Sequence, residues 1–234
     1  MRVVSWNIEL GHNIEAAAEI LLGHPNLQSA DIVLTQEMST ESSNELAQLL
    51  GMNVLYDWAE LHCKTGEPFG NAIMSRAPLR DPEHLRLPHI ARINGQPRSA
   101  VFATATMDGA DLLIGSIHLE TVLLSLRRRV SQLEPVSAFV GGTTGPSIIG
   151  GDFNAASRRS IAAFERTLAA ADMQRLSALD DETFRRFGRP FALDHFFGRG
   201  LRAVDGGVVH TGTVSDHEPI WVELSSMASS EDRV

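Results

Sequence analysis

The first fifty residues alternate between two patterns of hydrophobic and polar positions. Residues 3–8 and 31–37 are rich in apolar and β-branched residues and are bounded by polar ones, which is typical of buried strands. Apolar residues from Ile14 to Leu22 recur at helical spacing before Gly23, and a second helical stripe ends at Gly51. The pattern therefore predicts a β-α-β-α beginning.

Strand-like runs then follow one another without helices, at residues 54–58, 70–75, 99–106 and 111–118. Their direct succession favours antiparallel pairing. A long amphipathic helix is expected over 122–140, with Arg127–Arg129 mostly on its solvent side. The remaining elements are predicted to be a strand at 147–151, a helix around 161–168, and strands at 193–197, 203–209 and 219–224.

Each half of the chain thus contains strands, a helix and further strands, which fits an α/β fold of two sheets packed face to face with helices outside. The 234 residues, 43% of them hydrophobic, are sufficient for one large domain, and no linker-like segment divides the middle. We expect a single domain over 1–225 and a flexible C-terminal tail over 226–234.

Composition bears on the cellular location of the protein and on its binding partners. The chain has no run long and apolar enough for a transmembrane helix, and it begins with a strand pattern that does not fit a signal peptide. Cys63 is the only cysteine, so no internal disulfide can form and a cytoplasmic location is expected. No feature indicates an obligate protein partner. The net charge of −9 counts against a non-specific nucleic-acid binder, unless several carboxylates surround a metal ion.

Polar residues recur at the ends of the predicted strands, where a rigid scaffold can bring them together. Taken singly, each has an ordinary explanation: Glu37 as an exposed carboxylate, Asn7 as a turn residue, His118 as a satisfied imidazole, and Asp152 with Asn154 as a turn or helix cap. The whole set is Asn7, Glu9, Glu37, His118, Glu120, Asp152, Asn154, Asp194, Asp216 and His217.

Short motifs around these positions occur in a fixed order from Val3 to Leu224. They are Ser5-Trp6-Asn7-Ile8-Glu9, Thr35-Gln36-Glu37, Gly70-Asn71-Ala72-Ile73-Met74-Ser75-Arg76, Ile117-His118-Leu119-Glu120, Gly151-Asp152-Phe153-Asn154, Leu193-Asp194-His195-Phe196-Phe197 and Ser215-Asp216-His217. In this order they resemble the endonuclease/exonuclease/phosphatase superfamily, which has the fold of deoxyribonuclease I. The resemblance implies a four-layer αββα sandwich and a divalent-metal-dependent hydrolase of phosphate esters.

The resemblance also implies a Mg²⁺ site, with Mn²⁺ as a substitute, because hard cations prefer oxygen ligands. Its expected ligands are Glu37 and Asn7, with Asp216 and the more remote Glu9 contributing directly or through water. Whether one or two metals bind stays open.

Catalytic roles implied by the resemblance fall on five residues. Asp152 is expected to align or deprotonate the attacking water, and Asn154 to donate to a phosphoryl oxygen. His217 is expected to contact the phosphate as a base or as a cation, with Asp194 orienting its ring, while His118 is a second phosphate ligand. Asn71 and Arg76 are weaker candidates, since Arg76 can instead hold a turn.

Substrate choice is not fixed by these motifs. The segment from Phe184 to Phe191 interleaves arginines with aromatic residues, which suits stacking on nucleic-acid bases but also suits rings plugged into a core. Three hypotheses follow: a nuclease or DNA end-processing phosphodiesterase acting on DNA or RNA, a phosphoesterase for a small or lipid-linked phosphate ester, and a non-catalytic binding module.

Overall fold

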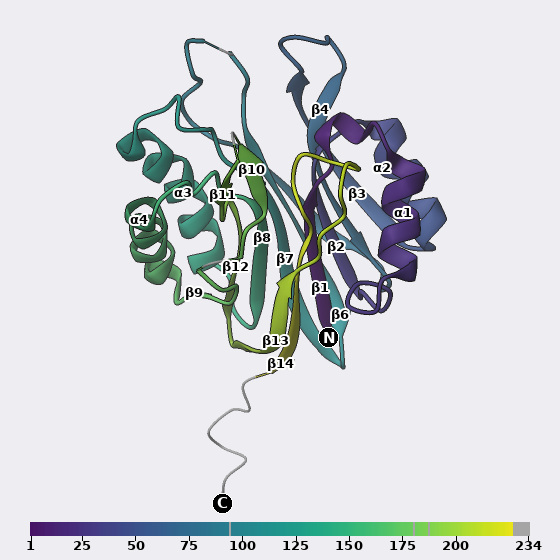
Figure 1. Cartoon of the computed structure of the whole chain (residues 1–234). Coiled ribbons are helices and arrows are strands. Elements are labelled where there is room, and N and C mark those ends of the chain that lie inside the picture. The colour runs from purple at the N-terminus through teal and green to yellow at the C-terminus, as the bar shows by residue number, and fades with distance from the viewer. Residues whose placement is uncertain (94, 180, 187, 227–234) are drawn as a thin grey trace, which may run out of the picture.

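The computed structural model describes residues 1–93, 95–179, 181–186 and 188–226. Two six-stranded sheets pack face to face, and helices cover both outer faces (Figure 1). The four layers and the mixed sheets confirm the predicted fold class.

The first sheet runs in the order β13 (Leu201–Val208), β14 (Ile220–Ser226), β1 (Arg2–Asn7), β2 (Ile32–Met38), β4 (Pro68–Ser75) and β3 (Asn53–Leu61). The second runs in the order β5 (Arg80–Arg86), β6 (Ser99–Met107), β7 (Ala110–His118), β8 (Ser147–Asp152), β12 (Asp194–Arg199) and β9 (Gln174–Arg175). A separate hairpin pairs β10 (Phe184–Arg186) with β11 (Arg189–Phe191).

Helices α1 (Ile14–Gly23) and α2 (Thr40–Leu50) cover the first sheet, while α3 (Leu126–Gly141) and α4 (Arg158–Leu168) cover the second. Two 3₁₀ turns, η1 (Glu9–Gly11) and η2 (Ala169–Ala171), complete the described elements. The Ser39 side chain accepts from the backbone N–H of Ser42 at the start of α2, and left-handed Gly51 ends that helix as predicted.

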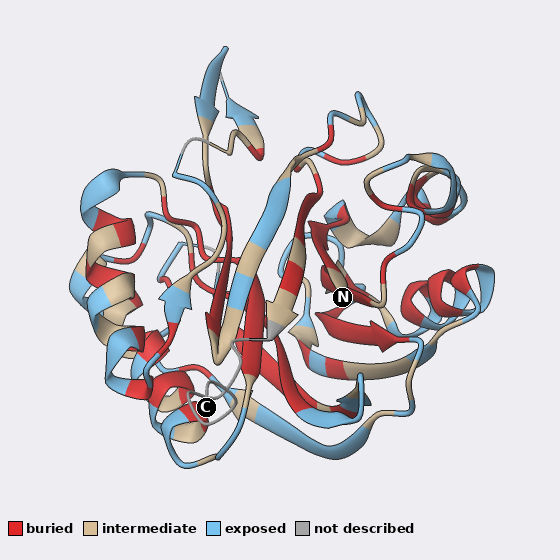
Figure 2. Cartoon of the chain, turned by 90° about the horizontal axis from the view of Figure 1, so that it is seen from below, coloured by how far each residue is buried: buried red, intermediate tan, exposed pale blue. Residues whose placement is uncertain are grey.

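Apolar side chains fill three spaces, one beneath each pair of helices and one between the sheets. Figure 2 shows buried positions concentrated on the inner strands and on the inward faces of the helices. Leu34, Ile114 and Phe196 are fully buried between the sheets. Burial on both faces explains why the central strands have nearly continuous apolar runs.

Strand direction brings the polar strand ends to one edge. β1 is parallel to β2, and β7 is parallel to β8, so Asn7, His118 and Asp152 end their strands on the same side. β12 and β14 are antiparallel to their neighbours and start at that edge. Gly151 fits only as glycine, because an added Cβ would lie 1.9 Å from the carbonyl oxygen of Ile117.

The structure corrects the predicted elements at several points. The long helix starts at Leu126, and Val122 lies in the preceding connection with 62% of its surface exposed. Arg129 is buried and does not face solvent. β5 was not predicted as a strand, since its residues are mostly exposed and it contains Pro82 at a register shift. Of the predicted tail over 226–234, Ser226 belongs to β14, and residues 227–234 lie outside the described part.

Candidate active site

Asp152 lies at the centre of a row of three side chains set by strand register. Asp152, on β8, lies directly opposite His118 on the neighbouring strand β7 and opposite Asp194 on the neighbouring strand β12. All three residues are buried. The Oδ2 atom of Asp152 lies 3.3 Å from Nε2 of His118 and 3.3 Å from Nδ2 of Asn7. The carboxylate therefore joins the ends of both sheets.

The protonation of Asp152 is decided by competing effects. Burial alone would raise its pKa, but the positive charge of His217 and hydrogen bonds from His118 and the Asn154 N–H outweigh burial. These partners hold the pKa of Asp152 below its usual value, so the group is a carboxylate at neutral pH.

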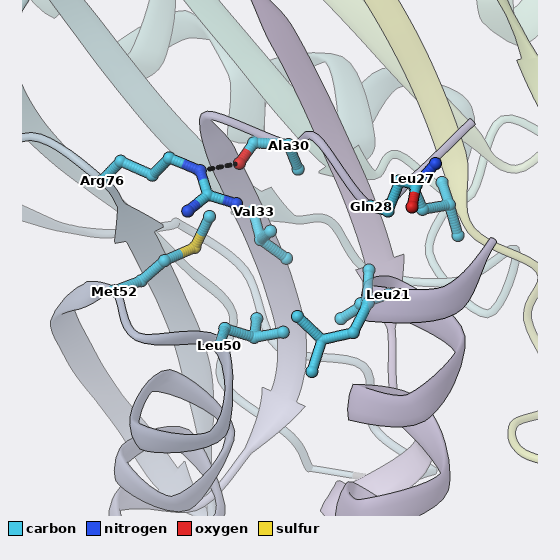
Figure 3. A pocket seen from close by; sticks show the side chains of 9 residues that line it. Leu21, Leu27, Gln28, Ala30, Val33, Leu50, Met52 and Arg76 are labelled. Carbon is cyan, nitrogen blue, oxygen red and sulfur yellow. Dashed lines mark hydrogen bonds between the residues drawn. The ribbon is translucent and has the colours of Figure 1, made fainter. Parts of the chain in front are cut away.

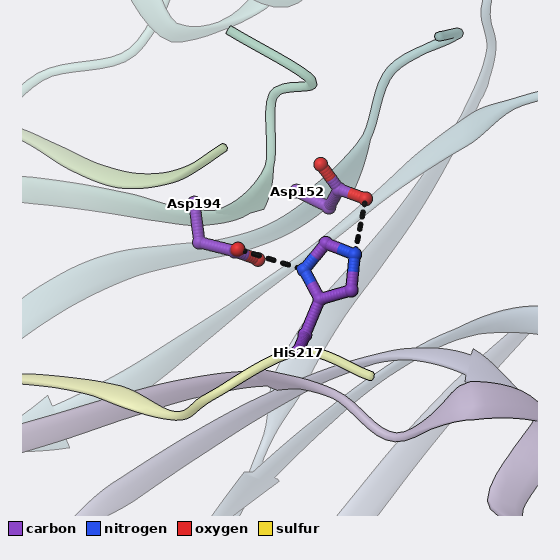
Figure 4. Close-up of side chains that lie close together, drawn as sticks. All are labelled: Asp152, Asp194 and His217. Carbon is purple, nitrogen blue, oxygen red and sulfur yellow. Dashed lines mark hydrogen bonds and ion pairs between the residues drawn. The ribbon is translucent and has the colours of Figure 1, made fainter. Parts of the chain in front are cut away.

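His217 lies between two buried carboxylates (Figure 4). Its Nδ1 is 2.9 Å from Oδ2 of Asp194, and its Nε2 is 3.7 Å from Oδ2 of Asp152. Burial would lower the pKa of His217, but Asp194 and Asp152 overcome this and raise it to about 10. One ligand-capable atom from each of the three residues lies within 4.8 Å of the others.

The loop that carries His217 is anchored to β1. The indole Nε1 of Trp6 donates to the backbone oxygen of His217 at 2.8 Å, and the Ser215 hydroxyl donates to the backbone oxygen of Asn7 at 2.7 Å. The backbone N–H of His217 in turn donates to Ser215 Oγ at 3.2 Å. The Ser215-Asp216-His217 motif is thereby held in a fixed position at the end of β1.

Acidic residues gather on the open side of this row. Glu37 lies at a bulge in β2 with φ of 59°, and its Oε1 is 3.9 Å from Nε2 of His118. Glu9, on η1, is exposed, and its backbone N–H donates to Oδ1 of Asn7 at 3.3 Å. The Asp216 side chain is exposed, yet partial removal from water together with Glu9, Glu37 and Asp152 raises its pKa to about 6, against the opposing charge of His217.

Asn154 lines the pocket and forms hydrogen bonds with Asp152 and with the segment after β7. It adopts a left-handed backbone with φ of 50°, and its backbone N–H donates to Oδ1 of Asp152 at 2.8 Å. Its side-chain Nδ2 donates to the backbone oxygen of Leu119 at 3.0 Å, so one of its amide hydrogens is already engaged within the protein. The second amide hydrogen is the one left for a substrate oxygen.

Two buried arginines at the site escaped the sequence analysis. Arg98 Nη1 lies 2.8 Å from His118 Nε2, and Arg98 Nη2 pairs with Oε1 of Glu120 at 3.2 Å. Arg129 Nη1 donates to the backbone oxygen of Asn154 at 2.7 Å. The only signal for Arg98 was its position directly before a predicted strand, and helical periodicity placed Arg129 on the wrong side.

The two weaker candidates differ in their distance from this cluster. Arg76 is at the opposite end of its sheet, where Nε donates to the backbone oxygen of Ala30 at 2.9 Å over a small apolar hollow lined by Met52 and Val33 (Figure 3). Asn71 Nδ2 donates to the backbone oxygen of Ser99 at 2.9 Å and so ties the two sheets together. Asn71 is also in register with Gln36, next to Glu37, so it borders the cluster, whereas Arg76 does not.

A pocket of about 280 Å³ opens over the row. Its floor includes Asp152 and His217, and its walls include Val122 and the two aromatic residues of the β10–β11 hairpin, Phe184 and Phe191. The Phe184 ring lies 4.8 Å from the His217 ring, and Thr183 Oγ1 accepts from the backbone N–H of Asp194 at 3.2 Å. The hairpin is therefore part of the site.

The sequence matches the model of the Endonuclease/Exonuclease/phosphatase family over residues 4–217. The chain belongs to this family. Among solved structures, an endonuclease/exonuclease/phosphatase from Beutenbergia cavernae has a TM-score of 0.76 at 20% identity, covering 97% of this chain and 71% of that one.

Two further structures show how widely this family fold is used. D. rerio TDP2, complexed with a single-strand DNA product, has a TM-score of 0.77 at 17% identity and coverage of 97% of this chain and 99% of that chain. The Bacteroides thetaiotaomicron mannosyl-6-phosphatase Bt3783 has a TM-score of 0.71 at 19% identity and coverage of 96% and 99%. At these identities the likeness shows the shared fold, and the substrates named belong to those proteins.

No helix within the described ranges is long and apolar enough to cross a membrane.

Proposed function

We propose that this family member is a Mg²⁺-dependent phosphoesterase that cleaves phosphodiester bonds at the pocket over Asp152. The observation that carries the proposal is the His217 imidazole held between the Asp194 and Asp152 carboxylates, with further acidic residues on the open side. The buried arrangement of Asp194, His217 and Asp152 supplies acid–base groups for hydrolysis, and the acidic residues on the open side suit a cation.

The residues on the open side of the site suit a metal ion because their negative charges lie close together. Burial, together with the negative charges of Glu9, Glu37 and Asp152, raises the pKa of Asp216, as expected where several carboxyl groups lie close together. Oxygen donors from Glu37, Asp216 and Asn7, with Glu9 farther out, would hold Mg²⁺, or Mn²⁺ in its place. When bound, the ion polarises the phosphoryl group and neutralises charge on the leaving oxygen.

The chain's own residues divide the remaining work. Asp152 stays ionised and accepts a hydrogen bond from the attacking water, which aligns it with the phosphorus. His217 carries a proton at neutral pH, so it acts on the phosphate as a cationic hydrogen-bond donor, with Asp194 fixing its ring through Nδ1. His118 and the second amide hydrogen of Asn154 contact other phosphoryl oxygens.

Two substrates have separate support. Phe184 and Phe191 beside Arg186 line the pocket, which favours a nucleic-acid end whose base stacks on the rings. The compact pocket and the net charge of −9 favour a small or lipid-linked phosphate ester instead. We take the nucleic-acid phosphodiester as the first candidate. The sole cysteine supports a cytoplasmic setting.

A substrate panel with and without Mg²⁺ tests this proposal. Tailed oligonucleotides and plasmid DNA would be compared with phosphomonoesters and dispersed phospholipids, each with EDTA as the matched control. Turnover of at least one class that EDTA abolishes is expected. No turnover of any class with Mg²⁺ or Mn²⁺ would support a binding module and reject the enzyme assignment.

A further inference from the structure

Exposed aliphatic side chains are concentrated on the edge that carries the candidate active site. Five of them, Leu61, Ile90, Ile93, Val122 and Leu123, form what we call the apolar rim. Ile93 is 83% exposed and Val122 62%, and Val122 also lines the pocket. Leu61 is the last residue of β3, and Ile90 and Ile93 lie in the β5–β6 connection. The β3–β4 and β5–β6 connections project from the same end of the sandwich (Figure 1). Large aliphatic side chains gathered in water at a site mouth indicate a binding surface.

Two glutamines hold the three connections of the rim together. Gln96 accepts from the backbone N–H of Cys63 at 2.9 Å and so ties the β5–β6 connection to the β3–β4 connection. Gln132 donates to the backbone oxygen of His89 at 3.2 Å and accepts from the backbone N–H of Glu120 at 3.0 Å. It thereby ties the β5–β6 connection to the segment before α3. The rim is one supported surface.

The charge beside the rim is opposite to that of the whole chain. Residues 87–98 and 121–133 contain no aspartate or glutamate, although the net charge of the protein is −9. These two segments carry Arg92, Arg127 and Arg128, and all three side chains are exposed. The third connection of the rim, residues 62–67, adds Lys64 and Glu67, which are both exposed. The rim side of the pocket mouth is therefore aliphatic with an excess of basic residues, whereas the acidic residues Glu37 and Asp216 line the pocket itself. The rim complements a partner that is both apolar and anionic.

We propose that the apolar rim docks on the surface of an anionic phospholipid bilayer. Aliphatic side chains at connection tips can enter the boundary between headgroups and acyl chains, while the arginines contact lipid phosphates. All five rim side chains are aliphatic, so the rim itself offers no ring on which a base could stack. Docking would turn the pocket mouth toward lipid headgroups. Docking would favour the second substrate candidate, a lipid-linked phosphate ester, over the first. That consequence rests on the proposed phosphoesterase function, whereas docking does not.

Vesicle co-sedimentation tests the proposal without any need for turnover. The full chain would be mixed with phosphatidylcholine vesicles and with vesicles that also contain phosphatidylglycerol. The wild type is expected to partition onto the anionic vesicles and to be released by high salt. The double variant Ile93→Asn/Leu123→Asn is expected to bind about tenfold or more weakly, because two aliphatic side chains no longer enter the interface.

Matched variants separate the rim from general hydrophobicity and charge. Leu22→Asn/Leu49→Asn removes two exposed leucines from α1 and α2 and is expected to bind like the wild type. Arg127→Gln/Arg128→Gln is expected to lose the preference for anionic vesicles. A wild type that fails to sediment with anionic vesicles, equal loss in both leucine and rim variants, or rim-dependent binding to DNA in place of vesicles would overturn the proposal. Thermal unfolding of each variant shows that it is folded.

Discussion

Arg129 donates a hydrogen bond from Nη1 to the backbone oxygen of Asn154 at 2.7 Å, which connects the middle of the α3 core face to a residue in the pocket. The guanidinium lies over the Phe164 ring, forms no ion pair with a carboxylate in the described ranges, and burial lowers its pKa. A buried cation without an anionic partner is costly. Its one described hydrogen bond fixes the left-handed turn of Asn154.

Arg129 is expected to influence catalysis through Asn154. Arg129→Met should lower kcat by about tenfold or more with little change in KM, since small misplacement of a catalytic group is costly. In an Asn154→Ala background, adding Arg129→Met should change kcat far less, because the group that it positions has gone. Exposed Arg128→Met is the control. Additive losses in the double variant would mean a purely structural role.

Asp194→Asn is expected to shift the pH profile of kcat. Asp194 helps raise the pKa of His217 to about 10, so losing its charge lowers that pKa. If protonated His217 is the active form, the falling alkaline limb of the profile should move to lower pH. Profiles of kcat against pH for both proteins measure this, and an unmoved alkaline limb would contradict the cationic role of His217.

Metal binding is expected to stabilise the fold. Mg²⁺ or Mn²⁺ that binds only the native state adds about 2.7 kcal/mol at one hundred times its Kd. Tm should rise on titration, and Glu37→Gln or Asp216→Asn should remove most of that rise. Glu19→Gln, at an exposed position on α1, serves as the matched charge control. A titration that leaves the wild-type Tm unchanged would speak against the acidic cluster as a metal site.

Because His195 is buried in its neutral form, the folded protein is expected to lose stability in mild acid. Burial, helped by the charge of Arg175, lowers the pKa of His195 to about 4 from its ordinary 6.5. As pH falls from 6.5 to 4, the unfolded chain binds a proton that the folded chain excludes, so the free energy of unfolding decreases. Over this whole pH range the free energy of unfolding decreases by about 3 kcal/mol.

Chemical denaturation at pH 7.5 and pH 4.5 measures this effect. His195→Gln should be less stable than the wild type at pH 7.5, and its deficit should shrink at pH 4.5. A deficit that is the same at both pH values would contradict a neutral buried His195.

The sequence predicted those parts of the fold that local pattern determines. Strands that are buried on both faces, such as β2 and β8, have apolar runs with polar ends, so both their existence and the position of Asp152 could be inferred. β5 could not, since it is an exposed edge strand whose pairing with β6 depends on contacts distant in sequence. The β10–β11 hairpin likewise owes its place to Thr183 and Phe184 packing beside His217 and Asp194.

The candidate site shows the same division. Asp152, His118 and Asp194 could be predicted to converge because each stands at a strand end, and register alone makes them neighbours. Arg98 and Arg129 could not, because arginines in a polar connection and in an arginine-rich helical turn have no local pattern that marks them as buried. Only the tertiary packing shows that their guanidinium groups reach His118 and Asn154.

Hydrolysis of bis-p-nitrophenyl phosphate is the most direct test of metal-dependent phosphodiester cleavage by Asp152 and His217. With Mg²⁺ or Mn²⁺, Asp152→Asn and His217→Ala should each lower kcat by about 100-fold or more, since a positioned acid–base group typically contributes about 10²–10⁴-fold. Thermal unfolding would show that both variants are folded. Equal metal-dependent turnover in the wild type and both variants would contradict the assignment of these residues. Wild-type turnover that persists in EDTA would contradict the metal dependence.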